Sequence, residues 1–251
     1  VGGLGATPRF DGEATVRAAD LSRFSRIAGR PLAGSVNLSA NGSATLDASR
    51  FDLTADLRAN GLRTGIAQAD QLLAGGTTTL QASAVRTGPN APIRVRTFNL
   101  NAPGLDATAN GSILGGASDL TFNARLANLG QFVPNLNGPL TAQGRAGQQG
   151  SNISLDVALT GPEGIQAQVD GTVAQSFDRA NIDVAGNAPL RIANPFLGNR
   201  ALTGTARFDL GLNGPLQPSS ASGTITVEGG RLVDPSVPFV LNDINGTAQL
   251  Q

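Results

Sequence analysis

The sequence of 251 residues contains no histidine, cysteine, lysine, tyrosine, tryptophan or methionine. Imidazole and amine bases, thiol nucleophiles and the usual zinc and haem ligands are therefore missing. Serine is plentiful, but no histidine or lysine is present to activate it, and a Walker-type phosphate loop lacks its lysine. We therefore expect a protein that is not an enzyme and has no cofactor.

Carboxylates are the remaining groups with catalytic or metal-binding chemistry. Asp52 and Asp56 share one face of a predicted strand, but that face also carries Thr54 and Arg58, as a solvated surface does. The calcium-loop pattern of EF-hands and the glycine-rich calcium repeat of β-rolls are both absent from the sequence. The sequence thus predicts neither a catalytic carboxylate pair nor a metal site.

The charge balance and the hydropathy of the sequence argue against nucleic-acid-binding and membrane-spanning proteins. Lys+Arg and Asp+Glu are both 18, so no excess of basic residues is available to neutralise phosphates, and we expect no nucleic-acid partner. No apolar run approaches the roughly 18 residues that a membrane helix needs, and no signal-peptide pattern is present. The chain begins without Met and ends inside a strand-like pattern, which favours an internal segment of a longer chain.

Alternation of apolar and polar residues is the main feature that the sequence does have. Residues 35–47, SVNLSANGSATLD, place apolar residues or glycine at every even position from Val36 to Leu46 and polar residues at the odd ones. This period of two is typical of strands with one apolar face. The same alternation predicts strands at FDLTADLRA (51–59), IRVRTFNLNA (93–102), LTFNARL (120–126), ISLDVAL (153–159), IQAQV (165–169) and ARFDLGL (206–212).

Two irregularities have structural meanings. The alternation slips by one residue between Val95 and Phe98, and we expect a β-bulge near Arg96 to absorb the slip. A short motif, in which Gly is followed by Ser or Thr between apolar or alanine residues, recurs seven times. Because each glycine is in phase with the apolar face, we interpret it as a position inside a strand where the sheet bends or a backbone approaches closely. The seven are Gly34, Gly42, Gly111, Gly171, Gly204, Gly223 and Gly246.

Short helices are predicted near residues 20–29, 126–133 and 194–198. In the first, Asp20 is a plausible N-cap, Phe24 and Ile27 lie at helical spacing, and Gly29 is a stop signal. No repeat of constant length is present. The sequence therefore predicts one continuous all-β domain over residues 1–251, interrupted by two or three short helices.

Three architectures are compatible with strands that have one apolar face. The first is a sandwich or barrel whose apolar faces form a closed core and whose loops bind a ligand. The second is a β-helical adhesin or secreted passenger segment, although such helices usually have a steadier period. The third is a sheet that stays open and bends lengthwise, so that its apolar face lines a groove. Inward glycine and alanine and a low aromatic content of 4% favour the groove, because a closed core would use larger residues.

The units DLSRFSRIAGRPLAGSVNL and LANLGQFVPNLNGPLTAQGR, with the closing run GTITVEGGRLVDPSVPFVLNDINGTAQL, resemble the TamB family. This family is the inner-membrane subunit of the translocation and assembly module, within the AsmA-like group of bridge-like lipid transport proteins. The similarity extends from about residue 10 to the end of the chain and consists of apolar and glycine patterns.

The resemblance implies an elongated, curved, taco-like β-sheet with a hydrophobic groove, in a periplasmic protein anchored in the inner membrane. It also implies transport of phospholipid between the two membranes, protein secretion and outer-membrane biogenesis, and an Omp85-class barrel as partner. An alternative role is assembly or chaperoning of outer-membrane proteins, in which an exposed sheet edge templates a client strand.

On this interpretation the groove binds phospholipid acyl chains. The predicted lining residues are Val36, Leu38, Leu46, Phe51, Leu53, Leu57, Phe122, Ile153, Leu155, Val157, Ile165, Val169, Phe208, Leu210, Ile225 and Val227.

Overall fold

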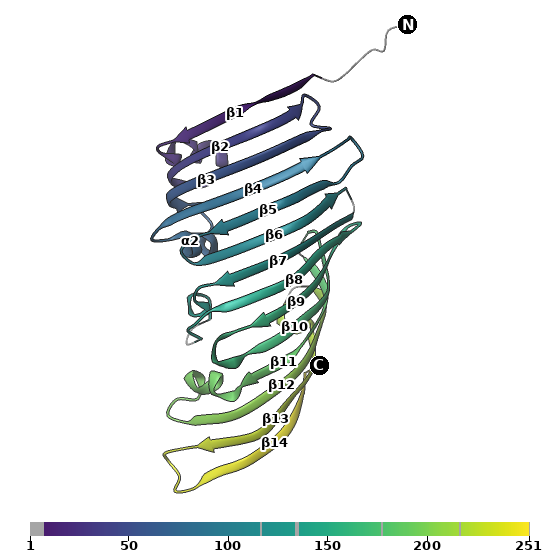
Figure 1. Cartoon of the computed structure of the whole chain (residues 1–251). Helices are drawn as coiled ribbons and strands as arrows, with labels where there is room; N and C mark the ends of the chain where they lie inside the picture. Colours follow the sequence, from purple (N-terminus) through teal and green to yellow (C-terminus); the bar gives the residue numbers. More distant parts are fainter. Residues whose placement is uncertain (1–7, 116, 134–135, 177, 216, 251) are drawn as a thin grey trace. The chain divides into compact units, whose positions relative to one another are not determined.

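The computed structural model describes residues 8–115, 117–133, 136–176, 178–215 and 217–250. Over these residues the chain is all-β, with antiparallel strands and a few short helices (Figure 1). Its contacts divide it into two compact units, residues 1–127 and 128–251, which we call unit 1 and unit 2. The expected all-β class is confirmed, whereas the expectation of one continuous domain stays a prediction.

Unit 1 is built on seven strands, which pair in sequence order, each antiparallel to its neighbour. The strands are β1 (Arg9–Ala18), β2 (Ala33–Thr45), β3 (Phe51–Arg63), β4 (Thr77–Arg86), β5 (Ile93–Asn101), β6 (Leu105–Leu114) and β7 (Ala117–Leu126). The helical segments are the 3₁₀ turn η1 (Leu21–Phe24), α1 (Ser25–Ala28) and α2 (Ala67–Leu73).

Unit 2 repeats this plan with seven further strands in sequence order. They are β8 (Leu140–Gln149), β9 (Asn152–Thr160), β10 (Gln166–Ala174), β11 (Arg179–Pro189), β12 (Ala201–Pro215), β13 (Ala221–Val233) and β14 (Val240–Leu250). Its helical segments are 3₁₀ turns, namely η2 (Leu129–Gln131), η3 (Pro162–Gly164), η4 (Leu190–Phe196) and η5 (Pro218–Ser220).

The predicted helix at 20–29 is present as η1 followed by α1. The side chain of Asp20 accepts a hydrogen bond from the backbone N–H of Ser22, and Gly29 ends α1 in the left-handed conformation with φ 66°. The other two predicted helices correspond to the 3₁₀ turns η2 and η4 rather than to α-helices. The sequence pattern did not predict α2, whose N-cap residue Ile66 makes no side-chain capping bond.

The bulge expected near Arg96 is confirmed. The pairing register of β5 shifts between Val95 and Phe98 against β6, and between Ser83 and Ala84 of β4. The shift returns Phe98 to the face that carries Val95. The alternation of apolar residues therefore survives across the slip.

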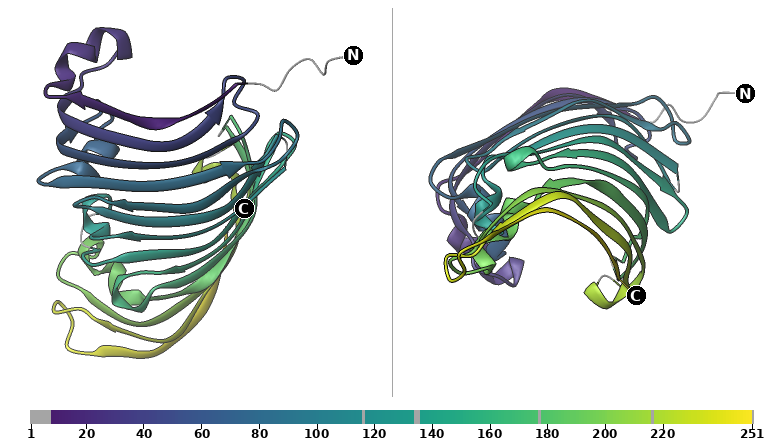
Figure 2. Two further views of the ribbon diagram at one scale, coloured as in Figure 1. Left: turned by 45° about the horizontal axis from the view of Figure 1, so that its top comes forward. Right: turned by 90° about the horizontal axis from the view of Figure 1, so that it is seen from below.

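The glycine interpretation is also confirmed. Six of the seven motif glycines lie inside strands with φ between 100° and 146°, and only Gly246, on β14, has no such angle. Gly171 shows why no other residue fits: a Cβ there would overlap the carbonyl oxygen of Asn181 and lie 2.8 Å from the Cα of Ile182. The neighbouring backbone thus approaches closely at the motif, as expected for bent strands. Figure 2 shows the strands of each unit bent along their length.

Candidate functional site

Pairing registers place the apolar residues of unit 1 in rows that cross all seven strands. Residues directly opposite each other on antiparallel strands point to the same face of the sheet. Two such rows run side by side, with one residue from each of β1 to β7. They are Val16, Leu38, Leu57, Leu80, Leu100, Ala107 and Ala124, and next to them Ala14, Ala40, Ala55, Ala82, Phe98, Ala109 and Phe122.

Unit 2 has the same arrangement, with one residue from each of β8 to β14. Its two central rows are Ala142, Leu159, Ala167, Gly186, Phe208, Ile225 and Ala248, and next to them Gly144, Val157, Val169, Val184, Leu210, Gly223 and Leu250. We call the side of each sheet that carries these rows the apolar face, and the opposite side the polar face.

The polar face is as uniform as the apolar one. A row of unit 1 on that side consists of Thr15, Ser39, Asp56, Gln81, Asn99, Thr108 and Asn123. None of the four central rows on the apolar faces contains a charged residue. The central rows of each sheet therefore form an uncharged hydrocarbon surface opposite a polar one.

The apolar faces are not sealed by other layers. Among the described residues no large side chain is fully buried, and Leu53 on β3 remains 38% exposed. The chain exposes 15353 Å². A compact monomer of 25.4 kDa exposes about 10,000 Å², and two separate compact domains of half that mass about 12,500 Å². Both figures are below the observed area, so the chain is more exposed than one or two compact domains of its mass.

Burial is greatest where helical segments meet the strand ends. Ala59 is fully buried on β3, the strand that α2 contacts. In unit 2 the 3₁₀ turn η4 contacts β12, and its Leu190 is buried beside Gly204. The helical segments thus cover the ends of the strands.

A hollow of about 570 Å³ lies in unit 2 against four neighbouring strands. Each of β9 to β12 contributes three consecutive residues, and the middle one of each triplet belongs to an apolar row. These middle residues are Leu159, Ala167, Gly186 and Phe208. The outer residues of the triplets belong to the polar face by register, and six of these eight are polar or charged.

Fourteen of the sixteen predicted lining residues lie on the apolar faces that the registers define. They are Val36, Leu38, Phe51, Leu53, Leu57 and Phe122 in unit 1, and Ile153, Leu155, Val157, Val169, Phe208, Leu210, Ile225 and Val227 in unit 2.

The other two predicted residues lie apart. Because β2 ends at Thr45, Leu46 lies in the turn that follows, where it is 72% exposed. Ile165 directly precedes β10. The predicted lining set omitted Leu80, Leu100, Val184 and Leu212. Leu100 and Leu212 lie in predicted strands, and the alternation in TTTLQASAVR and NIDVAG was a usable signal for Leu80 and Val184.

The carboxylates with strongly lowered pKa lie in turns, away from the apolar rows. Hydrogen bonds from the Ser236 side chain, Arg200 and the Ser236 backbone N–H lower the pKa of Asp234 to about 2. The turn after β2 holds Asp47, where bonds from Thr45 and Ser49 lower the pKa to about 2 as well. These shifts stabilise turns, because the groups that cause them belong to the turn or its neighbour.

The ion pairs of both units involve exposed side chains, except for Asp234, which is 20% exposed in its pair with Arg200. An example is Arg207 with Glu228, whose closest atoms are 4.0 Å apart. Exposed pairs of this kind contribute little to stability. Over the part of the chain that the structure describes, no group of three carboxylates is arranged to hold a metal ion, and no helix is long and apolar enough to cross a membrane.

No known family model matches the chain, and neither the curated proteins nor the solved structures gave a match. The functional argument therefore depends on the apolar faces themselves.

Proposed function

We propose that the apolar face of each unit binds the hydrocarbon chains of phospholipids, and that the chain is part of a non-enzymatic lipid conduit. One observation supports this most strongly: rows of apolar side chains cross all the strands of each unit and remain partly exposed. An uncovered hydrocarbon surface of this extent is usually a site of interaction.

The energetics suit transport. Burying a methylene group is worth about 0.8 kcal/mol, so a chain of about sixteen carbons with half of its surface covered would gain on the order of 6 kcal/mol. The attraction is non-directional, because it depends on area rather than on paired polar groups. A bound chain can therefore slide from one row to the next without crossing a large barrier.

The proposal includes shape and cellular location. If the concave side of the bent strands is the apolar face, each sheet forms the taco-like groove that the resemblance to the TamB family implies. The same resemblance supports a periplasmic location, an inner-membrane anchor and an Omp85-class barrel as partner. Together these describe a bridge for phospholipid between the inner and outer membranes.

Charged substitutions test the proposal in a vesicle-to-vesicle phospholipid transfer assay. We expect Leu53→Asp and Leu155→Asp to block transfer, because an unpaired carboxylate on the apolar face is costly to desolvate. Thr54→Asp and Ser154→Asp are matched controls, because they add the same charge to the polar face of the same strands. Unchanged transfer by the folded Leu variants would disprove the proposal.

A second candidate, the assembly of outer-membrane strands, is favoured by β14. Among the described strands it pairs only with β13, and if its other edge is unpaired in the whole protein it can template a client strand. Proline substitutions along β14, such as Thr247→Pro, would then abolish binding of client strands and leave lipid binding intact.

A further inference from the structure

A cavity of about 370 Å³ lies in unit 1 near the turn that joins β2 to β3. Its walls include Arg9, Arg50 and Arg86, together with the hydroxyl residues Ser43 and Thr45. Ser43 lies directly opposite Asp11 and Asp52 on the neighbouring strands, so it belongs to the polar face. The cavity is therefore on the polar face, where Asp52, Val85 and Thr87 also line it. By register, the side chains of Phe51 and Arg86 at its wall point to the apolar face.

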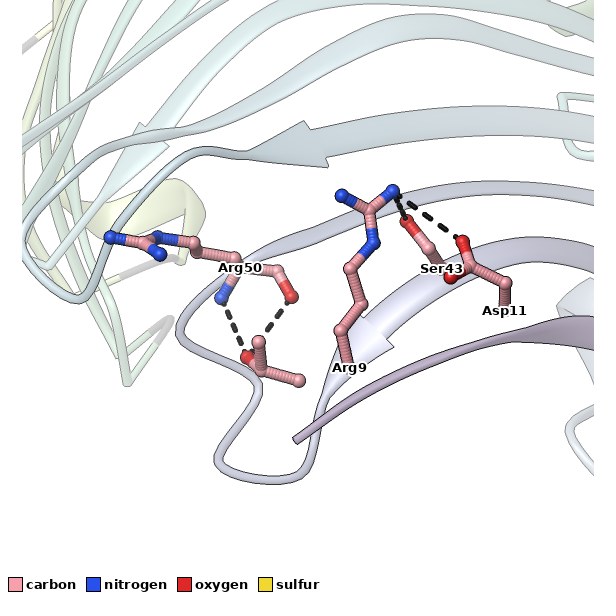
Figure 3. A network of polar contacts seen from close by, with 5 residues as sticks. Arg9, Asp11, Ser43 and Arg50 are labelled. Atoms are coloured by element: carbon pink, nitrogen blue, oxygen red, sulfur yellow. Dashed lines mark hydrogen bonds and ion pairs between the residues drawn. The ribbon is translucent and has the colours of Figure 1, made fainter. Parts of the chain in front are cut away.

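Arg9 and Ser43 form the first part of the site (Figure 3). Nη2 of Arg9 donates to Oγ of Ser43 at 2.6 Å. Ser43 is only 7% exposed, and its own O–H has no acceptor among the described residues. A buried hydroxyl donor without an acceptor is costly, and an oxygen atom of a ligand would satisfy it.

Arg50 is fixed from two sides. Its backbone N–H donates to Oγ1 of Thr45 at 3.0 Å, and the Thr45 hydroxyl donates to its carbonyl at 3.2 Å, as Figure 3 shows. Its Nε donates to the carbonyl of Thr87 at 3.2 Å. The guanidinium is thus held at the cavity wall, while the hydrogen bonds of the described residues leave its two Nη groups available.

Arg86 is held by carbonyl oxygens on the apolar side of the sheet, because its register partner on β3 is Phe51. Its Nε donates to Ala91 at 3.2 Å, its Nη1 to Ala48 at 3.5 Å, and its Nη2 to Pro89. These bonds join the turn after β2 to the turn after β4. The two turns beside the cavity are therefore held together.

Carboxylates near the cavity have partners of their own. Asp11 pairs with Arg9 at 3.4 Å, Asp52 pairs with Arg96, and Asp47 accepts the Ser49 N–H at 3.1 Å. Over the described residues, neither Arg50 nor Arg86 forms an ion pair. The cavity wall thus carries the guanidinium group of Arg50, which no carboxylate of the described residues matches, and that of Arg9, which also contacts Asp11.

We propose that this cavity binds the phosphate group of a small phosphate ester. Guanidinium groups match phosphate oxygens through paired N–H donors, and Ser43 supplies a hydroxyl donor. The volume equals that of about a dozen water molecules, which leaves room for the group esterified to the phosphate. The ester is either a soluble compound or a lipid headgroup, since both present the same chemistry. The proposal does not depend on lipid binding by the apolar face.

Titration of the full chain with inorganic phosphate and with glycerol 3-phosphate, followed by amide NMR, tests the soluble form. We expect saturable shifts at Ser43, Thr45 and Arg50. Binding should weaken by about tenfold in Arg50→Gln, because a hydrogen bond to a charged group is lost, and less in Ser43→Ala. Arg125→Gln on β7 should bind as the unchanged protein does, since Arg125 lies outside the cavity.

Flotation with phosphatidylglycerol vesicles tests the headgroup form. If the protein binds vesicles, Arg50→Gln weakens this binding and soluble phosphates cause no shifts, the site binds lipid headgroups. If soluble phosphates bind, Arg50→Gln weakens their binding and vesicles do not bind, the site binds soluble esters. Failure of the folded protein to bind in either assay, or an equal loss in Arg125→Gln, would overturn the proposal. Leu53→Asp, which should block lipid transfer, should still bind soluble phosphate. Failure of the phosphate site can therefore be distinguished from failure of the proposed conduit.

Discussion

The ring of Phe208 on β12 lies against Gly186, its direct partner on β11. A Cβ built on Gly186 would lie 2.7 Å from Cζ of Phe208 and 2.8 Å from the Cα of Ala167, and it would overlap the carbonyl oxygen of Gln166. The glycine thus makes space for the only aromatic ring in this row. Both residues line the hollow of unit 2.

Gly186→Ala should therefore destabilise unit 2. The added methyl group forces the ring and two backbones apart, which typically costs about 1–3 kcal/mol. Gly211→Ala on β12 is the control, because its Cβ would meet only ordinary contacts, the nearest at 3.5 Å from Oδ1 of Asp183. Urea unfolding measures both variants. Equal stability of the two alanine variants would contradict the described packing.

The glycine motif predicts that alanine substitutions at two of its positions differ in their effect on stability. Gly171→Ala combines a φ of 139° with overlap on the neighbouring backbone, so we expect a loss of about 2 kcal/mol or more in the free energy of unfolding. Gly246→Ala changes the same motif on β14, where nothing lies within 4 Å, and should change stability by about 0.5 kcal/mol or less. A neutral Gly171→Ala would show that the motif does not bend the strand.

Incomplete burial predicts an unusually small effect of truncating a central leucine. Leu57→Ala should cost about 1 kcal/mol, because the side chain is only half-buried on the apolar face. Leu190→Ala removes a buried side chain at 9% exposure and should cost about 2–3 kcal/mol. Unfolding of lipid-free protein compares the two. A loss above about 3 kcal/mol for Leu57→Ala would indicate a closed core.

Asp234 predicts a dependence of stability on pH. Its Oδ1 accepts from the Ser236 hydroxyl at 2.6 Å and its Oδ2 from Nε of Arg200 at 2.7 Å, and the pKa falls from 3.8 to about 2. A lowered pKa contributes stability above the unfolded value of 3.8, and this contribution is lost as the pH falls through about 2.

The difference in the free energy of unfolding between the unchanged protein and Asp234→Asn should therefore shrink between about pH 5 and about pH 2. Urea unfolding at several pH values measures it. A difference that stays constant over this range would contradict the described hydrogen bonds.

Much of the sheet could be predicted because its signal is local. Alternation located β2, β3, β5, β7, β9, β10 and β12, the slip at Arg96 located the bulge, and phase placed the motif glycines inside strands. The C-terminal end of β2 was less clear, because the alternation continues to Leu46, one residue beyond the strand. Helix α2 was missed because its stabilising bonds, from the N–H groups of Thr64 and Gly65 to Asp70, have no standard spacing.

Strand order and the cavity beside Ser43 could not be predicted because they depend on register. The sequence has no turn that fixes one pairing, although short connections favour the neighbour-to-neighbour order observed in each unit. Arg9 and Ser43 are 34 residues apart in the sequence and meet only because β1 pairs with β2. No spacing rule in a single sequence indicates such a contact.

The central claim is that the apolar faces bind lipid, and mass spectrometry of an organic extract of the purified protein tests it most directly. A β-sandwich protein purified in the same way is the control. We predict phospholipid above the control level, lost in Leu53→Asp and Leu155→Asp and retained in Thr54→Asp and Ser154→Asp. An extract without lipid from folded, monodisperse protein would contradict the claim and indicate that the apolar faces cover one another.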